Sequence, residues 1–364
     1  MRYIGPQVDI LRRPATFRGV AMRIVVFGAG GFLGGTVCEE LYQRSGIEQL
    51  ACIRKWASAV RLARRDIEIR QIDLEDKAAL SPLLEGADAV VNASMPPPVR
   101  EPELAADLYL ACDKAGVRRF IQLSSAAVYG DRNGEVSEDM PQLPLDEYGR
   151  SKVETERRLI AAASQSTTQL YILRPSIIYG PFSDAWTTRY VRRILIGRWR
   201  TLGRLGNGIC NLIHARDLAK IVIAAASIDN VAGTQVLNVN GPDVITWNEY
   251  IERLGDALSI PNRATPNALR FRGMAFAAQI LRMGSGFKLV RSIYRRSNGK
   301  ARSAMSSAQE VTALYPSPAE LALLSRKVHY SAERATAILG LSPSISIEEG
   351  VRQSVDWCRV HGIA

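Results

Sequence analysis

Paired cysteines are missing from this sequence of 364 residues. Five cysteines occur, an odd number, and no two form a Cys-x-x-Cys pair, which excludes a disulfide framework and a cysteine zinc site. The three histidines are not spaced with other ligands as a metal site requires. These residues are Cys38, Cys52, Cys112, Cys210, Cys358, His214, His329 and His361. The sequence therefore predicts a protein of the reducing cytoplasm that binds no metal.

Long apolar runs are also lacking. No segment reaches the roughly 18 residues that a membrane-spanning helix needs, and residues 1–22 have no apolar stretch of the kind found in a secretory signal. These first residues carry four arginines and precede the first strand-like segment. We interpret residues 1–22 as an N-terminal extension and expect a cytoplasmic protein.

Acidic residues are absent from residues 257–309, which contain ten Lys and Arg. This stretch carries most of the formal net charge of +11, and the remainder of the chain is close to neutral. We find no recognisable nucleic-acid-binding module, so a nucleic acid partner is not expected. Large apolar residues alternate with the arginines, which leaves two interpretations of residues 268–302: peripheral contact with an anionic membrane, or a helix packed on its own lobe.

Short apolar runs alternate with helical patterns along the first half of the chain. The expected strands are residues 23–27, 50–53, 67–72, 87–92, 120–124, 170–173 and 235–239. Such alternation predicts an α/β fold with a doubly wound parallel sheet and ligands at the carboxyl ends of its strands. We expect a dinucleotide-binding domain over residues 23–180, with a return segment at 209–240, and a smaller substrate-binding lobe from residues 181–208 and 241–364.

A glycine-spaced turn follows the first expected strand and opens a helix. Gly28 and Gly31 let the backbone turn sharply and approach a pyrophosphate, and Gly34 lets the helix pack close to the strand. The helix start at Phe32 and Leu33 adds backbone N–H groups and a positive dipole end. This arrangement predicts dinucleotide binding.

The residue about twenty positions after the last glycine of such a turn meets the adenosine ribose. Here it is Arg54, followed by Lys55, with no acid between Gln49 and Arg65. An arginine accommodates the 2′-phosphate of NADP, so NADP(H) is favoured and NAD(H) is the alternative. The remaining cofactor contacts are predicted at strand ends, at Asp73, Leu74 and Ser94.

Tyr148 and Lys152 are four residues apart and share one face of a helix. Hydride transfer at a carbon that bears oxygen needs a group that exchanges a proton with that oxygen. A phenol does so near neutral pH when a neighbouring ammonium stabilises the phenolate. Lys152 is placed to supply that charge and to hold ribose hydroxyls. Ser125, at the end of the fifth expected strand, is predicted to donate to the substrate oxygen.

These motifs, in this order, resemble an extended short-chain dehydrogenase/reductase of the NAD(P)-dependent epimerase/dehydratase family. The resemblance covers residues 23 to about 360. It rests on Gly28-Ala29-Gly30-Gly31-Phe32-Leu33-Gly34, Ser124-Ser125-Ala126-Ala127-Val128-Tyr129-Gly130, Tyr148-Gly149-Arg150-Ser151-Lys152, Leu173-Arg174-Pro175, Tyr179-Gly180-Pro181 and Ile213-His214-Ala215-Arg216-Asp217-Leu218-Ala219.

The resemblance implies a Rossmann-like fold with Ser125, Tyr148 and Lys152 as the catalytic trio. It also implies that the chain at Pro175 passes close to the nicotinamide. His214 and Asp217 are expected to hold the two lobes together. A homodimer built on the helices around residues 104–114 and 147–163 is expected as well.

Several departures from the family pattern limit the reactions and substrates that we expect. Ala126 and Ala127 replace the Asp-Glu pair of sugar-nucleotide dehydratases, so elimination of water is not expected. Cys210 stands where an arginine often binds a nucleotide diphosphate. Residues 101–105 replace the usual Asn-Val-x-Gly-Thr helix start, and residues 317–320 replace an Arg-Pro-Gly-Asp-like stretch.

The leading hypothesis is an NAD(P)-dependent epimerase or ketoreductase of a sugar nucleotide. Arginines of the smaller lobe could bind its diphosphate, and Arg189, Arg193 and Arg204 are the candidates. The alternative is a hydroxysteroid-dehydrogenase-like or flavonol-reductase-like enzyme that acts on an apolar ketone or alcohol near a membrane. A non-catalytic, cofactor-sensing regulator is a third hypothesis, although it would not need the trio.

Overall fold

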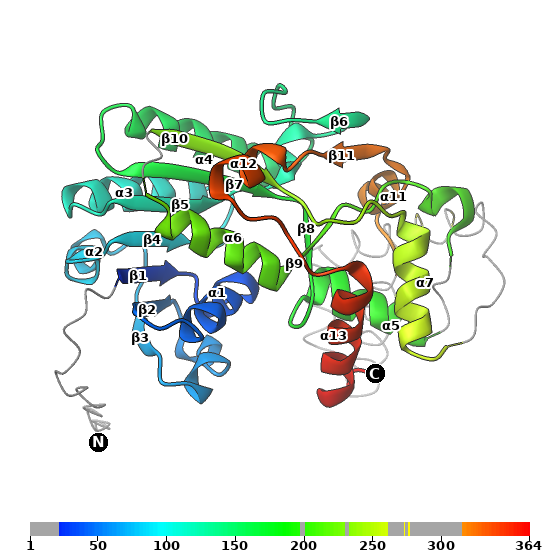
Figure 1. Ribbon diagram of the computed structural model, residues 1–364. Helices are drawn as coiled ribbons and strands as arrows, with labels where there is room; N and C mark the ends of the chain where they lie inside the picture. Colours follow the sequence, from blue (N-terminus) through cyan, green and yellow to red (C-terminus); the bar gives the residue numbers. More distant parts are fainter. Residues whose placement is uncertain (1–21, 197–200, 230–232, 261–272, 274–275, 277–314) are drawn as a thin grey trace, which may run out of the picture.

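The computed structural model describes residues 22–196, 201–229, 233–260, 273, 276 and 315–364 (Figure 1). Apart from Met22, the predicted N-terminal extension lies outside these residues, and so does nearly all of the basic stretch 268–302. The lobe expected at residues 241–364 is therefore described in part. Within the described ranges, no helix has the length and apolar character to cross a bilayer.

A parallel sheet of seven strands forms the centre of the described chain, in the order β10-β7-β5-β4-β1-β2-β3. The strands are β1 (Met22–Phe27), β2 (Ile47–Ile53), β3 (Glu68–Gln71), β4 (Ala89–Asn92), β5 (Arg119–Leu123), β7 (Gln169–Pro175) and β10 (Thr234–Val239). They coincide with the seven expected apolar runs. The predicted α/β fold with a doubly wound parallel sheet is confirmed.

Strand β1 illustrates why these segments form a sheet that is buried on both faces. Ile24 and Val26 point into one hydrophobic core, and Val25 and Phe27 point into the core on the opposite face. Because helices cover both faces, neither side of the strand can be polar. The sequence of β1 is accordingly an unbroken apolar run from Ile24 to Phe27.

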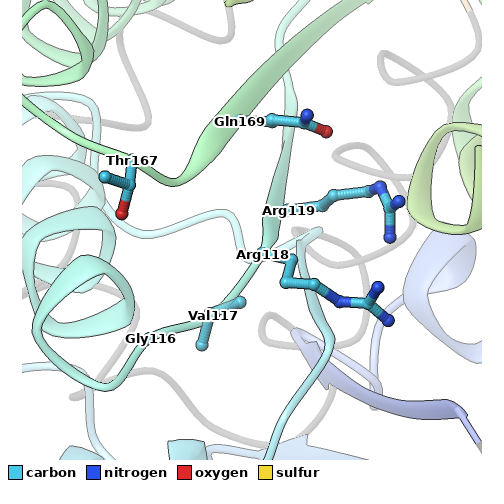
Figure 2. Close-up of a pocket in the computed structure, with 6 residues that line it drawn as sticks. All are labelled: Gly116, Val117, Arg118, Arg119, Thr167 and Gln169. Carbon is cyan, nitrogen blue, oxygen red and sulfur yellow. The ribbon is translucent and has the colours of Figure 1, made fainter. Parts of the chain in front are cut away.

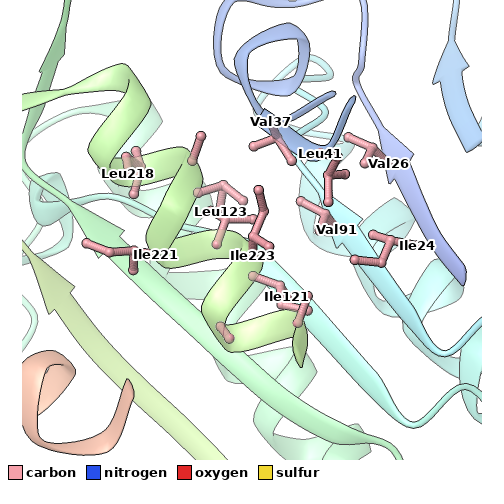
Figure 3. Close-up of a cluster of buried hydrophobic side chains, with 14 of the residues drawn as sticks. Ile24, Val26, Val37, Leu41, Val91, Ile121, Leu123, Leu218, Ile221 and Ile223 are labelled. Atoms are coloured by element: carbon pink, nitrogen blue, oxygen red, sulfur yellow. The ribbon is translucent and has the colours of Figure 1, made fainter. Parts of the chain in front are cut away.

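Two layers of helices enclose the sheet. One face is covered by α1 (Phe32–Tyr42), α6 (Ala215–Ser227) and α12 (Glu333–Leu339), and the other by α2 (Lys77–Leu84), α3 (Glu101–Lys114) and α4 (Glu147–Ala163). Figure 3 shows the first core, where Val37 of α1 and Ile223 of α6 meet Val91 and Ile121 of the sheet. This packing fixes the start of α1 and therefore the glycine turn before it.

The carboxyl ends of β1 and β4 define the crevice of the fold. These strands are neighbours in the sheet, but β1 leads into α1 on one face and β4 leads towards α3 on the other. Ligands of such folds bind where successive strands diverge in this way. Gly28, Ser94 and Ser125 follow β1, β4 and β5 and therefore lie at this same edge of the sheet.

A smaller lobe lies beyond these carboxyl ends (Figure 1). Its elements are β8 (Ile177–Tyr179), α5 (Arg189–Leu195), β9 (Leu212–His214), α7 (Trp247–Ala257), α11 (Pro318–Ser325) and α13 (Ile347–Val360), with β8 paired to β9. Its core is aromatic: the rings of Tyr190 and Trp247 stack at 5.9 Å, and Tyr250 packs beside them. Two further short strands, β6 (Gly134–Val136) and β11 (Val328–Tyr330), pair with each other.

Helix α12 departs from the expected division of the chain. Residues 333–339 fall in the segment that we expected to belong to the smaller lobe, yet Ala335 and Leu339 are buried in the core formed with α1 and α6. The apolar side of this short helix covers the sheet next to β10. The C-terminal segment therefore returns to the domain of the seven-stranded sheet before it ends in α13.

Candidate active site

The glycine turn between β1 and α1 leaves no room for side chains. Gly28 has φ +79°, a conformation that other L-residues rarely adopt, and a Cβ there would lie 2.5 Å from the carbonyl of Ala93. A Cβ on Gly34 would lie 2.2 Å from the carbonyl oxygen of Gly28. The backbone is therefore bare at the start of α1, where Phe32 and Leu33 contribute N–H groups that have no acceptor within the helix. This surface fits a dinucleotide pyrophosphate.

The strand ends beside this turn hold the other predicted cofactor residues. Ser94 follows β4, and its hydroxyl lies 2.5 Å from Asn92 Oδ1. Asp73 and Leu74 form the turn after β3, where Asp73 is exposed and accepts from the backbone N–H of Glu75 at 3.1 Å. Pro175 ends β7 and is buried. All four positions lie at the carboxyl edge of the sheet.

Arg54 and Lys55 lie directly after β2, and both are exposed. Neither forms an ion pair with a described residue. A third cation of this segment, Arg61, is occupied: it donates to the carbonyl of Phe32 at 3.0 Å and pairs with Glu39 on the flank of α1. Arg54 and Lys55 are consequently open to a ligand at the carboxyl end of β2.

The predicted trio comes from two adjoining elements. Ser125 begins the 3₁₀ turn Ala126–Tyr129 after β5, and its Oγ accepts from the N–H of Ala127 at 3.2 Å. The first turn of α4 packs against this 3₁₀ turn, because a Cβ on Gly149 would lie 2.9 Å from the carbonyl oxygen of Ala127. Tyr148, next to Gly149, is 36% exposed. Its hydroxyl makes no hydrogen bond to a described residue.

Lys152 lies one helical turn after Tyr148 and is 3% exposed. Its Nζ is 5.5 Å from the centroid of the Tyr148 ring and donates to the carbonyl of Leu123, two residues before Ser125, at 3.0 Å. Nζ also lies 2.5 Å from Oε1 of Glu101, the first residue of α3. The structure therefore brings Tyr148, Lys152 and the end of β5 together.

Glu101 was not among the predicted site residues. Its sequence signal was visible, because an acidic residue followed by proline replaced the familiar start of this helix. A pairing with Lys152, which is 51 residues away in the chain, cannot be read from that signal. The fold supplies it by packing α3 against α4.

A buried network of hydrogen bonds joins the residues on both sides of Ser125. Arg174 of β7 donates from Nη2 to Glu156 at 2.6 Å and from Nη1 to the hydroxyl of Tyr129 at 2.7 Å. Ser124 donates to the same Glu156 carboxylate. Since burial of these groups is costly unless they are all hydrogen-bonded, the network fixes the backbone on both sides of Ser125.

The arginines predicted to bind substrate differ in their surroundings. Arg193 is 1% exposed, and its guanidinium donates to Glu320 of α11 at 2.5 and 3.1 Å, so it ties α5 to α11. Arg204 is exposed, and Arg189 lies 4.0 Å from the exposed Asp184. Of the three, Arg189 and Arg204 remain candidates for substrate contact.

Cys210 and His214 are structural residues of the interior. Cys210 is fully buried in the aromatic core, and burial raises the pKa of its thiol well above the usual value. Burial also lowers the pKa of His214 to about 4, so its ring is neutral, and Nδ1 accepts from the N–H of Arg216. Asp217 accepts from the backbone N–H groups of Ser344 and Ile345, which fastens α6 to the segment before α13.

A pocket of about 280 Å³ lies at the opposite end of the sheet, at the amino ends of β5 and β7 (Figure 2). Its cations are already paired, Arg118 with Asp88 at 2.8 Å and Arg119 with Asp229. The pocket is therefore separate from the glycine turn and the trio. It is lined by Gly116, Val117, Arg118, Arg119, Thr167 and Gln169. In the described part of the chain, no three His, Cys, Asp or Glu side chains gather as metal ligands.

Known proteins resemble this chain in sequence and in fold. The sequence model of the NAD dependent epimerase/dehydratase family matches residues 24–239, which is more than half of the chain. An N-acetyl-alpha-D-glucosaminyl-diphospho-ditrans,octacis-undecaprenol 4-epimerase of Escherichia coli O157:H7 is 27% identical over 75% of this chain and 83% of its own length. A decarboxylating sterol-4-alpha-carboxylate 3-dehydrogenase of Mus musculus is 23% identical over 92% of this chain and 90% of its own length.

Among solved structures, UDP-glucuronic acid 4-epimerase from Bacillus cereus in complex with NAD superimposes with a TM-score of 0.70. The match covers 93% of this chain and 99% of that structure at 19% identity, which indicates a shared fold. Together, the family match, the fold and the glycine turn establish the class of the chain. It belongs to the NAD dependent epimerase/dehydratase family and is an NAD(P)-dependent enzyme of the extended short-chain dehydrogenase type.

Proposed function

We propose that the chain is an epimerase or ketoreductase of a sugar nucleotide, with Ser125, Tyr148 and Lys152 as its catalytic residues. The observation that carries the proposal is the buried Lys152 ammonium beside the Tyr148 ring, at the same sheet edge as the bare glycine turn. The sugar epimerases described above support a sugar conjugate over an apolar ketone or alcohol. Ala126 and Ala127 leave no acidic group for a dehydration step.

Each member of the trio has a distinct role. When bound, the nicotinamide supplies or accepts a hydride at the carbon that bears the reacting oxygen. The Tyr148 hydroxyl exchanges the proton of that oxygen, and its exposure leaves it open to substrate. Ser125 Oγ donates a hydrogen bond to the same oxygen. Lys152 places its positive charge 5.5 Å from the Tyr148 ring and holds the cofactor ribose.

We also propose that the cofactor is NADP(H). Arg54 and Lys55 support this because they are exposed after β2, where the ribose of a bound dinucleotide lies in this fold class. Replacing Arg54 with alanine is expected to raise the Kd for NADPH about 10- to 100-fold, the loss of a charge-assisted hydrogen bond, and to leave that for NADH unchanged. Titration of cofactor fluorescence measures both constants. Arg64→Ala, an exposed arginine of the same segment, is the control.

An unchanged NADPH affinity when Arg54 and Lys55 are both replaced with alanine would assign the chain to NAD(H). Equal weakening of both cofactors would instead show that Arg54 acts on the shared part of the dinucleotide. Either result leaves the catalytic trio unaffected and corrects the cofactor alone.

A homodimer is proposed through α3 and α4. These helices pack side by side, and Leu110 of α3 and Ile160 of α4 remain exposed. Covering two such apolar side chains would favour association of two copies through this helix pair.

A second candidate substrate is a sugar diphosphate carried on a polyprenyl lipid. Four exposed apolar side chains, here called the apolar rim, favour it: Met95, Val99, Leu143 and Leu145. Both rim segments contact the first turns of α4, because Ser151 donates to Pro98 at 2.8 Å and a Cβ on Gly149 would lie 3.0 Å from Pro144. The Escherichia coli relative is named for such a substrate, and the acid-free sequence 268–302 would suit peripheral contact with the membrane that carries it.

Thermal denaturation with NADPH present separates the two substrates. Uridine diphosphate at a hundred times its Kd adds about 2.7 kcal/mol of stability, which raises the Tm by roughly 3–4 °C for a protein of 364 residues. We expect that increase for a sugar-nucleotide enzyme and no increase with farnesyl diphosphate. The reverse pattern would assign the lipid-linked sugar. If neither diphosphate raises the Tm, the proposed substrate class is wrong.

A further inference from the structure

Glu101 and Lys152 form a buried ion pair between two helices. Each side chain is 4% exposed, and Lys152 Nζ lies 2.5 Å from Glu101 Oε1. The second carboxylate oxygen, Oε2, lies 3.1 Å from the hydroxyl of Ser151, the neighbour of Lys152 on α4. Both oxygens of Glu101 are thus directed at the segment that carries the proposed catalytic lysine.

Two of the three N–H groups of the Lys152 ammonium have protein acceptors, and the third has none among the described residues. One N–H is directed at Glu101 Oε1 and a second at the carbonyl of Leu123. No other described protein atom accepts from Nζ. A lysine side chain has four freely rotating bonds, and two fixed acceptors on different elements restrict where the third N–H points. That N–H is available to a ligand or to the Tyr148 oxygen.

Helix capping alone does not account for Glu101. A carboxylate in the first turn of α3 interacts favourably with the helix dipole, but an exposed one does so equally well. Glu103 in the same turn is exposed and pairs with Arg100. Burial of an ion pair seldom increases stability, because desolvation offsets the attraction. The burial of Glu101 therefore calls for a role that Glu103 does not have.

We propose that Glu101 is a positioning residue that acts through Lys152. Its carboxylate holds the ammonium so that the remaining N–H faces the cofactor ribose and the Tyr148 oxygen. This inference rests on the proposed role of Lys152. It extends the site by a residue on α3, an element that otherwise contributes nothing to the trio.

A double-mutant cycle on cofactor affinity tests the inference without any substrate. The Kd for NADPH and for NADH is measured by fluorescence in the wild type, Glu101→Gln, Lys152→Met and the double variant. We expect a Kd about 10-fold higher in Glu101→Gln and about 10- to 100-fold higher in Lys152→Met. In the Lys152→Met background, Glu101→Gln is expected to change the Kd less than twofold, because the group it positions is absent.

Glu320→Gln is the matched control. It neutralises the carboxylate of another buried ion pair, with Arg193, in the smaller lobe. We expect it to lower the Tm to a similar degree and to leave the cofactor Kd within twofold of the wild type. If Glu101→Gln does not fold, Ser151→Ala replaces it, since it removes the hydroxyl that lies 3.1 Å from Oε2 and keeps both charges.

The outcomes separate this inference from the proposed function. A Lys152→Met variant that binds cofactor like the wild type would remove Lys152 from the proposed site. A weakened Lys152→Met together with an unaffected Glu101→Gln would refute only the positioning role. The same refutation follows if the two substitutions weaken binding independently, with fully additive effects.

Discussion

Replacing Tyr148 with phenylalanine is expected to lower kcat by about 10²- to 10⁴-fold, the usual contribution of a general acid or base. The change deletes the oxygen that exchanges a proton with the substrate and keeps the ring beside Lys152. The side chain is 36% exposed, and its hydroxyl bonds to no described residue. No buried partner is left unsatisfied, so the free energy of unfolding should change by less than about 0.5 kcal/mol. Initial rates and urea denaturation measure the two effects.

Cofactor affinity provides the internal check on this variant. The Kd for NADPH should stay within about twofold of the wild type, since the proposed ribose contacts come from Lys152. Tyr42→Phe, at the far end of α1 and also exposed, is the matched control and should keep full activity. Turnover of Tyr148→Phe at more than a tenth of the wild-type rate would contradict the assignment of Tyr148 as the proton-exchanging group.

The strands of the sheet could be predicted because the burial of each strand determines which residue types it contains. A strand that is buried on both faces, such as β1, must be apolar along its buried part. The turn at Gly28 requires glycine, because a Cβ there would lie 2.5 Å from the backbone of Ala93. Both requirements are local in sequence. The order of the seven strands is not local in sequence and comes from the structure.

Side-chain partners were less accessible to prediction. Arg193 was expected to meet substrate, yet it pairs with Glu320, which is 127 residues further along the chain. The sequence shows an arginine on a helix but not which side of α5 packs against α11. Glu101 illustrates the same limit. Its burial depends on how α3 meets α4, and helix packing is decided by the whole interface and not by the residues next to it.

Helix α12 adds a limit of another kind. Its seven residues are too few for a periodic pattern to distinguish a helix that covers the sheet from one in the smaller lobe. Ala335 and Leu339 become informative only when the position of β10 at the sheet edge is known. Chain order alone favoured the smaller lobe, because the preceding and following helices belong to it.

The largest structural effect is expected from Gly28→Ala. The new Cβ would overlap the carbonyl of Ala93 at 2.5 Å, and φ +79° adds strain of about 1–2 kcal/mol. Because the overlap is with backbone, relief requires the ends of β1 and β4 to separate where the pyrophosphate would bind. A displacement of about 1 Å at such a site costs on the order of 10²-fold. We expect the Kd for NADPH to rise by at least that factor, measured by fluorescence titration.

Two glycines distinguish crowding from backbone strain. Gly46 has φ +77°, and no atom lies within 4 Å of a Cβ built there, so Gly46→Ala carries the strain alone and should leave the cofactor Kd unchanged. At Gly31, φ is not positive and the nearest atom to a Cβ is the Gly28 carbonyl oxygen at 3.2 Å, which predicts an intermediate loss. The expected order of Kd is Gly28→Ala above Gly31→Ala above Gly46→Ala. An equal Kd for Gly28→Ala and Gly46→Ala would show that the turn does not hold the dinucleotide, because the first substitution moves the backbone of the proposed pyrophosphate site and the second does not.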